Sequence, residues 1–174
     1  MLGTIPDLSN SPPSWRGMGP ADIPDIIRLA DRVHPDLPES RSVFEERLAL
    51  YPAGCLVLEA SGQIAGYTLA HPIRYPHPPK LDTLIGAIVP DSDAFYIHDV
   101  VVAPEWRGGG RADAAIRRLL TLAMDYPKTC LVSVYGTMPF WRRYGFAECG
   151  EALPAGTLDG YGADARWMLR VSTN

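Results

Sequence analysis

The sequence predicts a single mixed α/β domain, and three observations lead to that fold class. Two helical patterns come first in the chain, a pair of strand-like segments follows, and the second half alternates between strand and helix. The length of 174 residues suits one domain with a substantial apolar core. Hydrophobic residues make up 47% of the chain and charged residues 21%, a composition that argues against a wholly disordered protein.

The amino-terminal part is expected to be an arm followed by two helices. Residues 1–16 are rich in Pro, Ser and Asn and predict a flexible arm, so that the domain would span residues 17–174. Apolar residues recur at helical spacing from Ile23 to Ala30 and predict the first helix. A second helix is expected to open at Glu39 and to end before the Pro and Gly residues that follow Leu50.

The middle of the chain changes to the two-residue period of strands. Cys55–Glu59 and Ile64–Ala70 are strand-like, and Ser61-Gly62 between them has the composition of a hairpin turn. A proline-rich segment follows and predicts a surface loop that carries His71 and His77. Because no third ligand stands near these two histidines, we expect both to be surface residues and do not expect a metal site there.

The second half is expected to complete the sheet and to add one long helix. Phe95–Val102 is a strong strand prediction because it is rich in aromatic and β-branched residues. Residues 112–126 predict a helix with one apolar face, which Pro127 ends. Further predicted elements are a strand at Leu131–Val134, a short helix at Pro139–Tyr144, and strands near Phe146 and at Arg166–Val171.

Charge and cysteine usage argue against several classes of protein. The net charge of −4 argues against nucleic-acid binding through bulk charge, although the acidic excess lies in residues 1–99 and the remainder is mildly basic. The start of the chain lacks the pattern of a signal peptide, and no apolar run reaches the length of a bilayer span. The three isolated cysteines argue against a disulfide framework and suit a reduced cytoplasm.

The most informative segment is Asp99–Asp113, where a buried strand leads through a glycine-rich turn into a helix. Gly108, Gly109 and Gly110 allow backbone to approach a ligand closely, and the first amides of a helix favour an anion. Arg107 and Arg111 flank the turn, and arginine offers a planar donor fork to phosphate. The segment therefore predicts a pyrophosphate site, with a tight turn that binds no ligand as the alternative.

Two widespread phosphate motifs do not fit this turn. A P-loop needs Lys and then Ser or Thr after the last glycine, whereas Arg111 and Ala112 stand there. A dinucleotide fingerprint counted from Gly108 needs Gly or Ala at the position of Asp113. What remains is an Arg-x-x-Gly-x-Ala pattern.

This pattern, Arg107-x-x-Gly110-x-Ala112, is similar to the R/Q-x-x-G-x-G/A motif of the GNAT acyl-CoA-dependent N-acetyltransferases. Residues 131–146 add to the resemblance, because a strand there precedes an aromatic-rich segment that ends in Gly-Phe. The resemblance covers about residues 17–171, and His98 before three valines looks like the arylalkylamine N-acetyltransferase branch. It implies a central, mostly antiparallel twisted sheet with a splayed central strand pair, flanked by helices.

The resemblance also implies acetyl-CoA as co-substrate and no metal. In the family, the backbone of the central strand holds the pantetheine arm, and the amides of the glycine turn hold the pyrophosphate. The corresponding cofactor-binding residues are Val100, Val101, Val102, Arg107, Gly108, Gly109, Gly110, Arg111, Ala112, Asp113, Phe140 and Trp141.

His98 is the candidate general base, because the ordinary pKa of histidine suits proton removal near neutral pH. Strict strand alternation would place its side chain on the face of Val100, with Asp99 on the opposite face. Tyr96 would share the face of His98 and could orient the substrate or a water molecule. A buried, hydrogen-bonded core histidine is the alternative for His98.

The general acid is where the chain departs from the family pattern. The family commonly places Tyr after Phe near the thiol, whereas Trp141 follows Phe140 here. The indole N–H has no acidic hydroxyl to offer, so Trp141 is expected to wall a channel. Tyr144 is the predicted catalytic acid, and Tyr135 or a proton from solvent is the alternative.

In the family, the first two helices and the final hairpin wall the acceptor pocket. Here they correspond to residues 34–47 and 156–167, and the predicted substrate-binding residues are Glu39, Tyr96 and Tyr161. The acidic side chains of the first segment predict an acceptor with a cationic amine, with a solvated helix face as the alternative.

Together these inferences predict a cytoplasmic enzyme that moves an acetyl group from acetyl-CoA to the primary amine of a small molecule by direct attack. Acetylation of proteins or peptides is the alternative within the enzyme class. A regulatory domain that binds acyl-CoA without turnover, and an α/β interaction domain without a ligand, are alternatives from other classes. The expected partners include neither nucleic acid nor membrane, and the resemblance implies a homodimer as a possible assembly.

Overall fold

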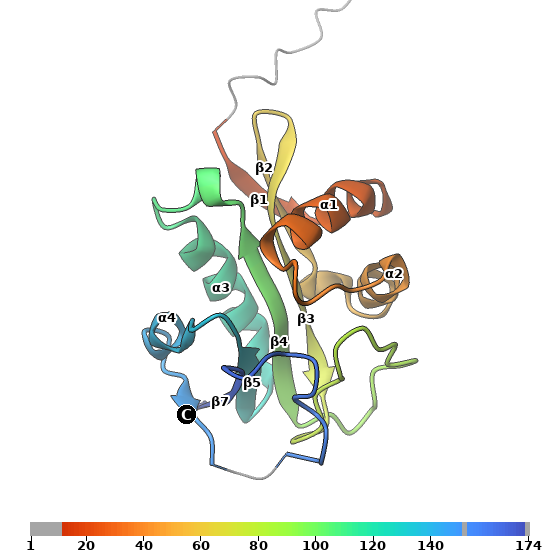
Figure 1. The fold of residues 1–174 in the computed structure, drawn as a ribbon, viewed down its shortest axis with the longest axis vertical. Coiled ribbons are helices and arrows are strands. Elements are labelled where there is room, and N and C mark those ends of the chain that lie inside the picture. Colours follow the sequence, from red (N-terminus) through yellow and green to blue (C-terminus); the bar gives the residue numbers. More distant parts are fainter. Residues whose placement is uncertain (1–11, 151–152, 173–174) are drawn as a thin grey trace, which may run out of the picture.

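A seven-stranded sheet runs through the computed structural model, which describes residues 12–150 and 153–172 (Figure 1). Neighbouring strands in this part of the chain are antiparallel except for one parallel pair, β4 and β5. The fold therefore confirms the mixed α/β class and the mostly antiparallel sheet. In sheet order the strands are β1 (Ser14–Gly17), β2 (Leu56–Ala60), β3 (Gln63–Ile73), β4 (Ala94–Val102), β5 (Lys128–Ser133), β7 (Arg166–Val171) and β6 (Ala147–Glu148).

Helices cover both faces of the sheet because each contributes one apolar stripe to a core (Figure 1). On one face, α1 (Ile23–Val33) and α2 (Arg41–Leu50) pack against β2, β3 and β4. On the other face, α3 (Arg111–Leu122) and α4 (Met138–Arg142) pack against β4, β5 and β7. The helical spacing in the sequence located α1 correctly, because Ile23, Ile26 and Leu29 are the residues that this helix buries.

The central strand pair is splayed, as the resemblance implies. β4 and β5 pair only where Ala94–Ile97 faces Lys128–Leu131, although β4 continues to Val102. β4 stays paired with β3 along that continuation. Its edge from His98 to Val102 therefore has no paired β5 residue beside it, which leaves backbone polar groups free for another partner.

A β-bulge at His98 overturns two predictions about the direction of side chains on this strand. Leu69 pairs with Asp99 but the next residue of β3 pairs with Ile97, so His98 is the extra residue of β4. His98 contacts Glu39 and Asp99 contacts His34, both on the side of α1 and α2. The prediction that Asp99 points away from His98 is therefore wrong. The prediction that His98 and Val100 share a face is also wrong, because Val100 packs in the core on the side of α3.

The chain enters the sheet earlier than predicted. Ser14–Gly17 pairs with β2, so residues 14–16 belong to the fold and the predicted end of the arm at residue 16 is wrong. The indole N–H of Trp15 donates to the carbonyl of Arg111 at 2.8 Å, and Arg118 donates to the carbonyl of Trp15. This strand thereby anchors the start of α3. Residues 1–11 of the predicted arm lie outside the described residues.

His71 is also placed differently from its prediction as a surface residue. β3 extends to Ile73, and His71 is buried within it, whereas His77 lies exposed in the following loop. Burial lowers the pKa of His71 to about 3, so this imidazole is neutral. No group of three or more metal-ligating side chains occurs among the described residues.

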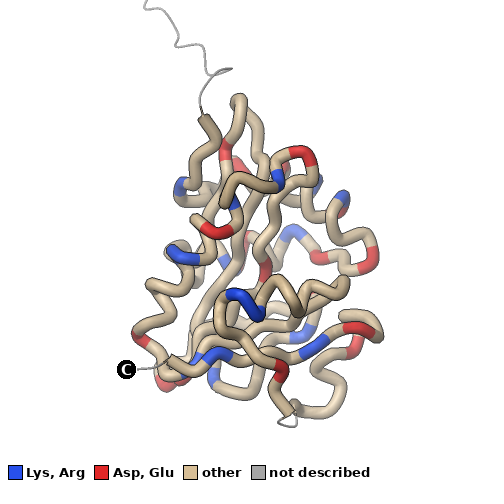
Figure 2. Tube along the Cα trace, turned by 90° about the vertical axis from the view of Figure 1, so that its left-hand side faces the viewer, with Lys and Arg blue, Asp and Glu red and all other residues tan. Residues whose placement is uncertain are grey.

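Charge and helix length complete the picture of the surface. Figure 2 shows acidic and basic residues interspersed along the trace rather than gathered by sign in that view. Within the described part of the chain, no helix combines the length and the apolarity needed to cross a bilayer.

Candidate active site

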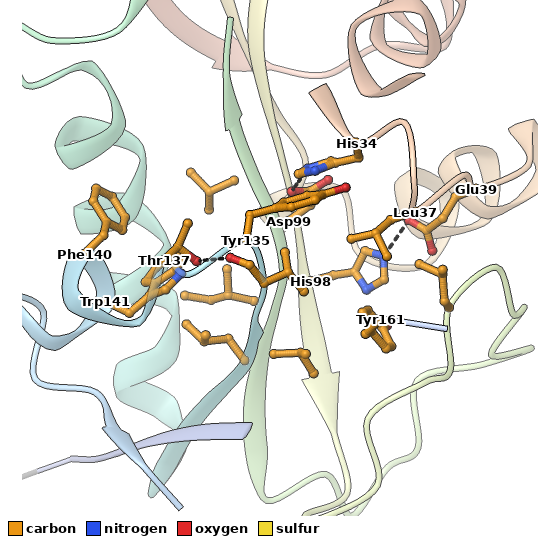
Figure 3. Close-up of a pocket in the computed structure, with 16 residues that line it drawn as sticks. His34, Leu37, Glu39, His98, Asp99, Tyr135, Thr137, Phe140, Trp141 and Tyr161 are labelled. Carbon is orange, nitrogen blue, oxygen red and sulfur yellow. Dashed lines mark hydrogen bonds and ion pairs between the residues drawn. The ribbon is translucent and has the colours of Figure 1, made fainter. Parts of the chain in front are cut away.

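Two adjoining cavities open where β4 and β5 diverge. We call them the large cavity, of 530 Å³, and the small cavity, of 140 Å³. They share His34, Val100, Tyr135, Thr137 and Phe140 in their walls. The large cavity is further lined by Val33, Val101, Val102, Arg107, Gly108 and Ala112. The small cavity (Figure 3) is further lined by Leu37, Glu39, Leu81, Ile97, His98, Asp99, Leu131, Val132, Val134, Trp141 and Tyr161.

The glycine turn closes one end of the large cavity. Gly108, Gly109 and Gly110 have φ values of +88°, +60° and +72°, a left-handed conformation that side chains other than glycine rarely adopt. Gly110 is the N-cap of α3. The first amides of α3 lack acceptors within the helix, so the turn presents donors and the positive end of the helix dipole.

The two arginines beside this turn have different roles. Arg107 donates from Nε to the carbonyl of Val102 at 3.1 Å and lines the large cavity. Arg111 instead donates to the carbonyls of Trp106 and Gly108, so it braces the turn from behind. Asp113 pairs with Arg117 on the surface of α3. Of the charged side chains near the turn, Arg107 is thus the one that faces the large cavity.

Glu39 and His98, which the sequence suggested for separate roles, form one buried pair. The Nε2 atom of His98 lies 2.8 Å from the Oε2 atom of Glu39. The His98 side chain is 3% exposed and the Glu39 side chain is 7% exposed. Glu39 lies two residues before α2 and also accepts the N–H of Asp82 through its other oxygen, so the carboxylate is held at two points. The bulge directs His98 toward it (Figure 3). The Nδ1 atom of His98 is buried and has no hydrogen-bond partner among the described residues.

A second histidine–carboxylate pair lies in the same cavity. His34 follows α1, and its Nε2 is 3.2 Å from one carboxylate oxygen of Asp99. The other oxygen of Asp99 accepts a hydrogen bond from the hydroxyl of Tyr67. Burial disfavours the charged imidazole, but the Asp99 carboxylate outweighs burial and raises the pKa of His34. Burial would likewise raise the pKa of Asp99, yet His34 and the hydrogen bonds lower it. No motif in the sequence marks this pair.

Tyr135 stands between the two cavities. It follows β5 in a left-handed conformation with φ of +51°, and its ring stacks on His34 with centroids 5.6 Å apart (Figure 3). Burial, followed by the nearby Asp36 carboxylate, raises the pKa of Tyr135. The phenol is therefore protonated at neutral pH, which is the form that a general acid needs.

Three other predicted aromatic residues are placed differently from one another. Tyr161 lines the small cavity, and its hydroxyl donates to the carbonyl of Pro79. Tyr96 is 0% exposed and lies beneath that cavity, covered by His71 and Trp167, so its prediction as a substrate-binding residue is wrong. Trp141, which was predicted to bind the cofactor, lines the small cavity and not the large one.

Tyr144, the predicted acid, lines neither cavity. It packs on Phe140 and Trp141 and lies in a separate depression with Asp113, Arg117, Leu120 and Arg143. Burial, followed by the Asp113 carboxylate, raises the pKa of Tyr144. The alternative position, Tyr135, lines both cavities.

Several wall residues escaped sequence analysis. Leu81 comes from the proline-rich loop, which α2 holds down through Glu46 and the buried Arg47. Leu37 and Thr137 also line the small cavity without belonging to any motif. Leu37 does lie within residues 34–47, the segment that was predicted to wall the acceptor pocket, although the residue itself was not named.

Replacing His34 by Gln is expected to reduce the dependence of stability on pH. Because the folded pKa of His34 is raised, its pairing with Asp99 stabilises the fold fully below the unfolded pKa of about 6.5. That contribution is lost as the pH rises through the folded pKa. Urea unfolding over a pH series should show the largest advantage of the wild type over His34→Gln below pH 6.5. A difference that does not change with pH would contradict the assignment.

Comparisons with known proteins agree with this geometry. The model of the acetyltransferase (GNAT) family matches residues 23–146. The loading GNATL domain of CurA from Lyngbya majuscula is 15% identical with a TM-score of 0.76, covering 92% of this chain and 98% of that chain. The search of curated proteins gives no match.

Two further structures share the fold. N-acetylglutamate synthase from Neisseria gonorrhoeae, complexed with coenzyme A and N-acetyl-glutamate, is 20% identical with a TM-score of 0.68, covering 95% of this chain and 36% of that chain. Arabidopsis thaliana Naa50, in complex with the bisubstrate analogue CoA-Ac-MVNAL, is 11% identical with a TM-score of 0.67, covering 92% and 99%. At these identities the likeness shows the fold, and the ligands belong to those proteins.

Proposed function

Because the chain belongs to the acetyltransferase (GNAT) family, we propose that it transfers an acetyl group from acetyl-CoA to the primary amine of a small molecule. The observation that carries the proposal is the pair of adjoining cavities. One ends at a glycine turn suited to a pyrophosphate, and the other contains the buried pair of His98 and Glu39.

The residues around the large cavity fit acetyl-CoA, which supplies the acetyl group as an activated thioester. The edge of β4 from His98 to Val102 has no paired β5 residue and offers amides and carbonyls to the pantetheine arm. The N-terminal amides of α3, with Arg107 beside them, would hold the pyrophosphate. Gly108 leaves open space where a side chain would stand, which supports close approach of an anion to the backbone.

His98 is the proposed general base, and Glu39 orients it. When His98 is neutral, its Nε2–H donates to the Glu39 carboxylate and the lone pair remains on Nδ1. Removing a proton from the acceptor ammonium exposes the nitrogen lone pair that attacks the thioester carbonyl. The Glu39 carboxylate then stabilises the imidazolium that forms, as a carboxylate does for a catalytic histidine elsewhere.

Tyr135 is the proposed general acid. A carbon–nitrogen bond forms and the carbon–sulfur bond breaks, so the departing thiolate needs a proton. Tyr135 lines both cavities, and its raised pKa keeps the hydroxyl protonated until it is needed. The acceptor nitrogen loses two protons as the ammonium becomes an amide: His98 takes the first, and Tyr135 takes the second after it has given its own proton to the thiolate. His98 then passes its proton to solvent, so the reaction releases one proton overall.

The small cavity favours an acceptor that has an amine and no carboxylate. Glu39 and Asp99 line it, whereas no Lys or Arg occurs among its described lining residues. A buried carboxylate on the acceptor would meet the like charge of Glu39 and Asp99 and no Lys or Arg to pair with. Leu37, Leu81 and Tyr161 supply an apolar wall for the remainder of the molecule.

Release of CoA with matched acceptor pairs tests this function. We expect tyramine and isoamylamine to have kcat/KM values at least about 100-fold higher than tyrosine and leucine, which add only the carboxylate; a 100-fold ratio corresponds to about 2.7 kcal/mol. Equal rates for amines and amino acids would contradict the acceptor class. Binding of acetyl-CoA without amine-dependent CoA release would favour the regulatory alternative.

Peptide acetylation is the competing activity within this family. An amidated tetrapeptide in the same assay separates the two, because only its first residue would fit a cavity of 140 Å³. If the peptide were turned over faster than every small amine, the proposed acceptor would instead be the amino terminus of a protein. A homodimer stays a prediction from the sequence.

A further inference from the structure

We propose that His34 is a positioning residue that holds the phenol of Tyr135 at the boundary between the two cavities. The proposal rests on the proposed acetyl transfer, because it assigns Tyr135 its acid role. It gives the second histidine–carboxylate pair of the small cavity a function distinct from that of His98 and Glu39.

Tyr135 needs an external support to keep one position. Its ring is attached to a turn outside the regular sheet, and the residue is 45% exposed. A non-glycine residue with positive φ costs about 1–2 kcal/mol, so the turn persists only when neighbours hold it. Gly136 takes part in the same turn with φ of +69°, and its N–H donates to Asp164 at 2.9 Å. That bond fixes the backbone of the turn, and the Tyr135 hydroxyl has a hydrogen bond with the backbone of Asp36, so the face of the ring is the part that still needs a support.

His34 supplies the support for the ring. The two rings are almost parallel, with an interplanar angle of 3° and centroids 5.6 Å apart, which is an offset stack. Both residues line both cavities, so the stack forms part of the boundary between them. Loss of this face would let the phenol turn toward solvent and away from the thioester.

His34 is itself rigid because two contacts hold it, and the carboxylate that makes one of them is held in turn. Its backbone N–H donates to the carbonyl of Ala30 and ends α1, while its Nε2 lies beside the Asp99 carboxylate. Tyr67 donates to that same carboxylate from β3. The bulge in β4 makes this possible, since it turns Asp99 to the face on which His34 lies. A support anchored in this way can hold a partner ring in place.

His34 has the same arrangement as His98, with Nε2 beside a carboxylate and Nδ1 buried without a hydrogen-bond partner among the described residues. What sets His34 apart is its stack on Tyr135, and the kinetics of variants distinguish a positioning residue from a second base. A positioning residue acts through the group it holds, so its effect should vanish when that group is removed. This dependence distinguishes His34 from an independent catalytic residue.

A double-mutant cycle between His34 and Tyr135 tests the proposal. We expect Tyr135→Phe to lower kcat by about 100-fold and His34→Ala by about 10-fold, with the amine KM unchanged in both. The double variant should lose no more than Tyr135→Phe alone, because His34 then has no acid to hold. His34→Phe keeps a flat ring against Tyr135 and should restore kcat to within about 3-fold of the wild type. His77→Ala, at an exposed histidine of the loop, is the matched control.

Losses that multiply in the double variant would overturn the proposal, and so would a His34→Phe variant as slow as His34→Ala. Full activity of Tyr135→Phe would overturn the acid assignment while leaving acetyl transfer intact. A readout independent of turnover is the order of the Tyr135 ring, measured by NMR relaxation with labelled tyrosine. The ring should become mobile in His34→Ala and stay ordered in His34→Phe, even if the proposed function fails and no amine is acetylated.

Discussion

Gly110→Glu is expected to weaken the binding of acetyl-CoA by about 100-fold, or about 2.7 kcal/mol. Gly110 is the N-cap of α3 with φ of +72°, so a side chain there strains the turn by about 1–2 kcal/mol. The added carboxylate would also stand at the helix end that we assign to the pyrophosphate, where it repels the phosphates. Isothermal titration with CoA measures the effect directly.

The fold should tolerate this substitution, which keeps the result interpretable. A Cβ atom at Gly110 meets no atom within 4 Å. Gly62 is a matched control, because it has φ of +73° in the turn between β2 and β3 and equally open space around it. Gly62→Glu therefore carries the same strain and the same charge at a place remote from the large cavity. It should lower stability similarly and leave CoA affinity unchanged. CoA binding of wild-type strength in Gly110→Glu would remove the turn from the cofactor site.

The sequence predicted the parts of the molecule that local chemistry determines. Helix α1 and the strand at Arg166–Val171 were predicted with bounds equal or close to the observed ones, because each depends on its own residues. The glycine turn also belongs to this class, since three adjacent glycines before a helix specify a left-handed N-cap. The start of the fold was placed at residue 17 instead of Ser14, because the pairing of β1 with β2 joins residues that lie 39 to 45 positions apart in the chain.

The site was predictable only where it follows a motif. His98 and Glu39 were both named, but their pairing depends on a bulge that arises from the register between β3 and β4. Alternation, which assumes a regular strand, cannot foresee an extra residue. The choice of Tyr144 over Tyr135 failed in the same way: proximity in sequence to Trp141 favoured the first, whereas the turn after β5 brings the second to the cavities.

His98→Ala is expected to lower kcat by about 100-fold or more while leaving CoA affinity within about 2-fold of the wild type. General base catalysis typically contributes factors of about 10² to 10⁴, and His98 lines the small cavity but not the large one. Rapid-mixing measurement of CoA release gives kcat, and titration gives the affinity. His71→Gln is a matched control, because His71 is a buried histidine that lines neither cavity.

The same substitution also disturbs stability, and a second variant separates the two effects. The Glu39 carboxylate is 7% exposed in the wild type. Without His98 it keeps only the N–H of Asp82, and leaving a buried group short of a hydrogen-bond partner costs about 1–3 kcal/mol. Adding Glu39→Gln removes the unpaired charge, so the double variant should regain part of the unfolding free energy. Its kcat should remain as low as that of His98→Ala, because the base is still absent. Recovery of kcat together with stability would show instead that His98 only supports the fold.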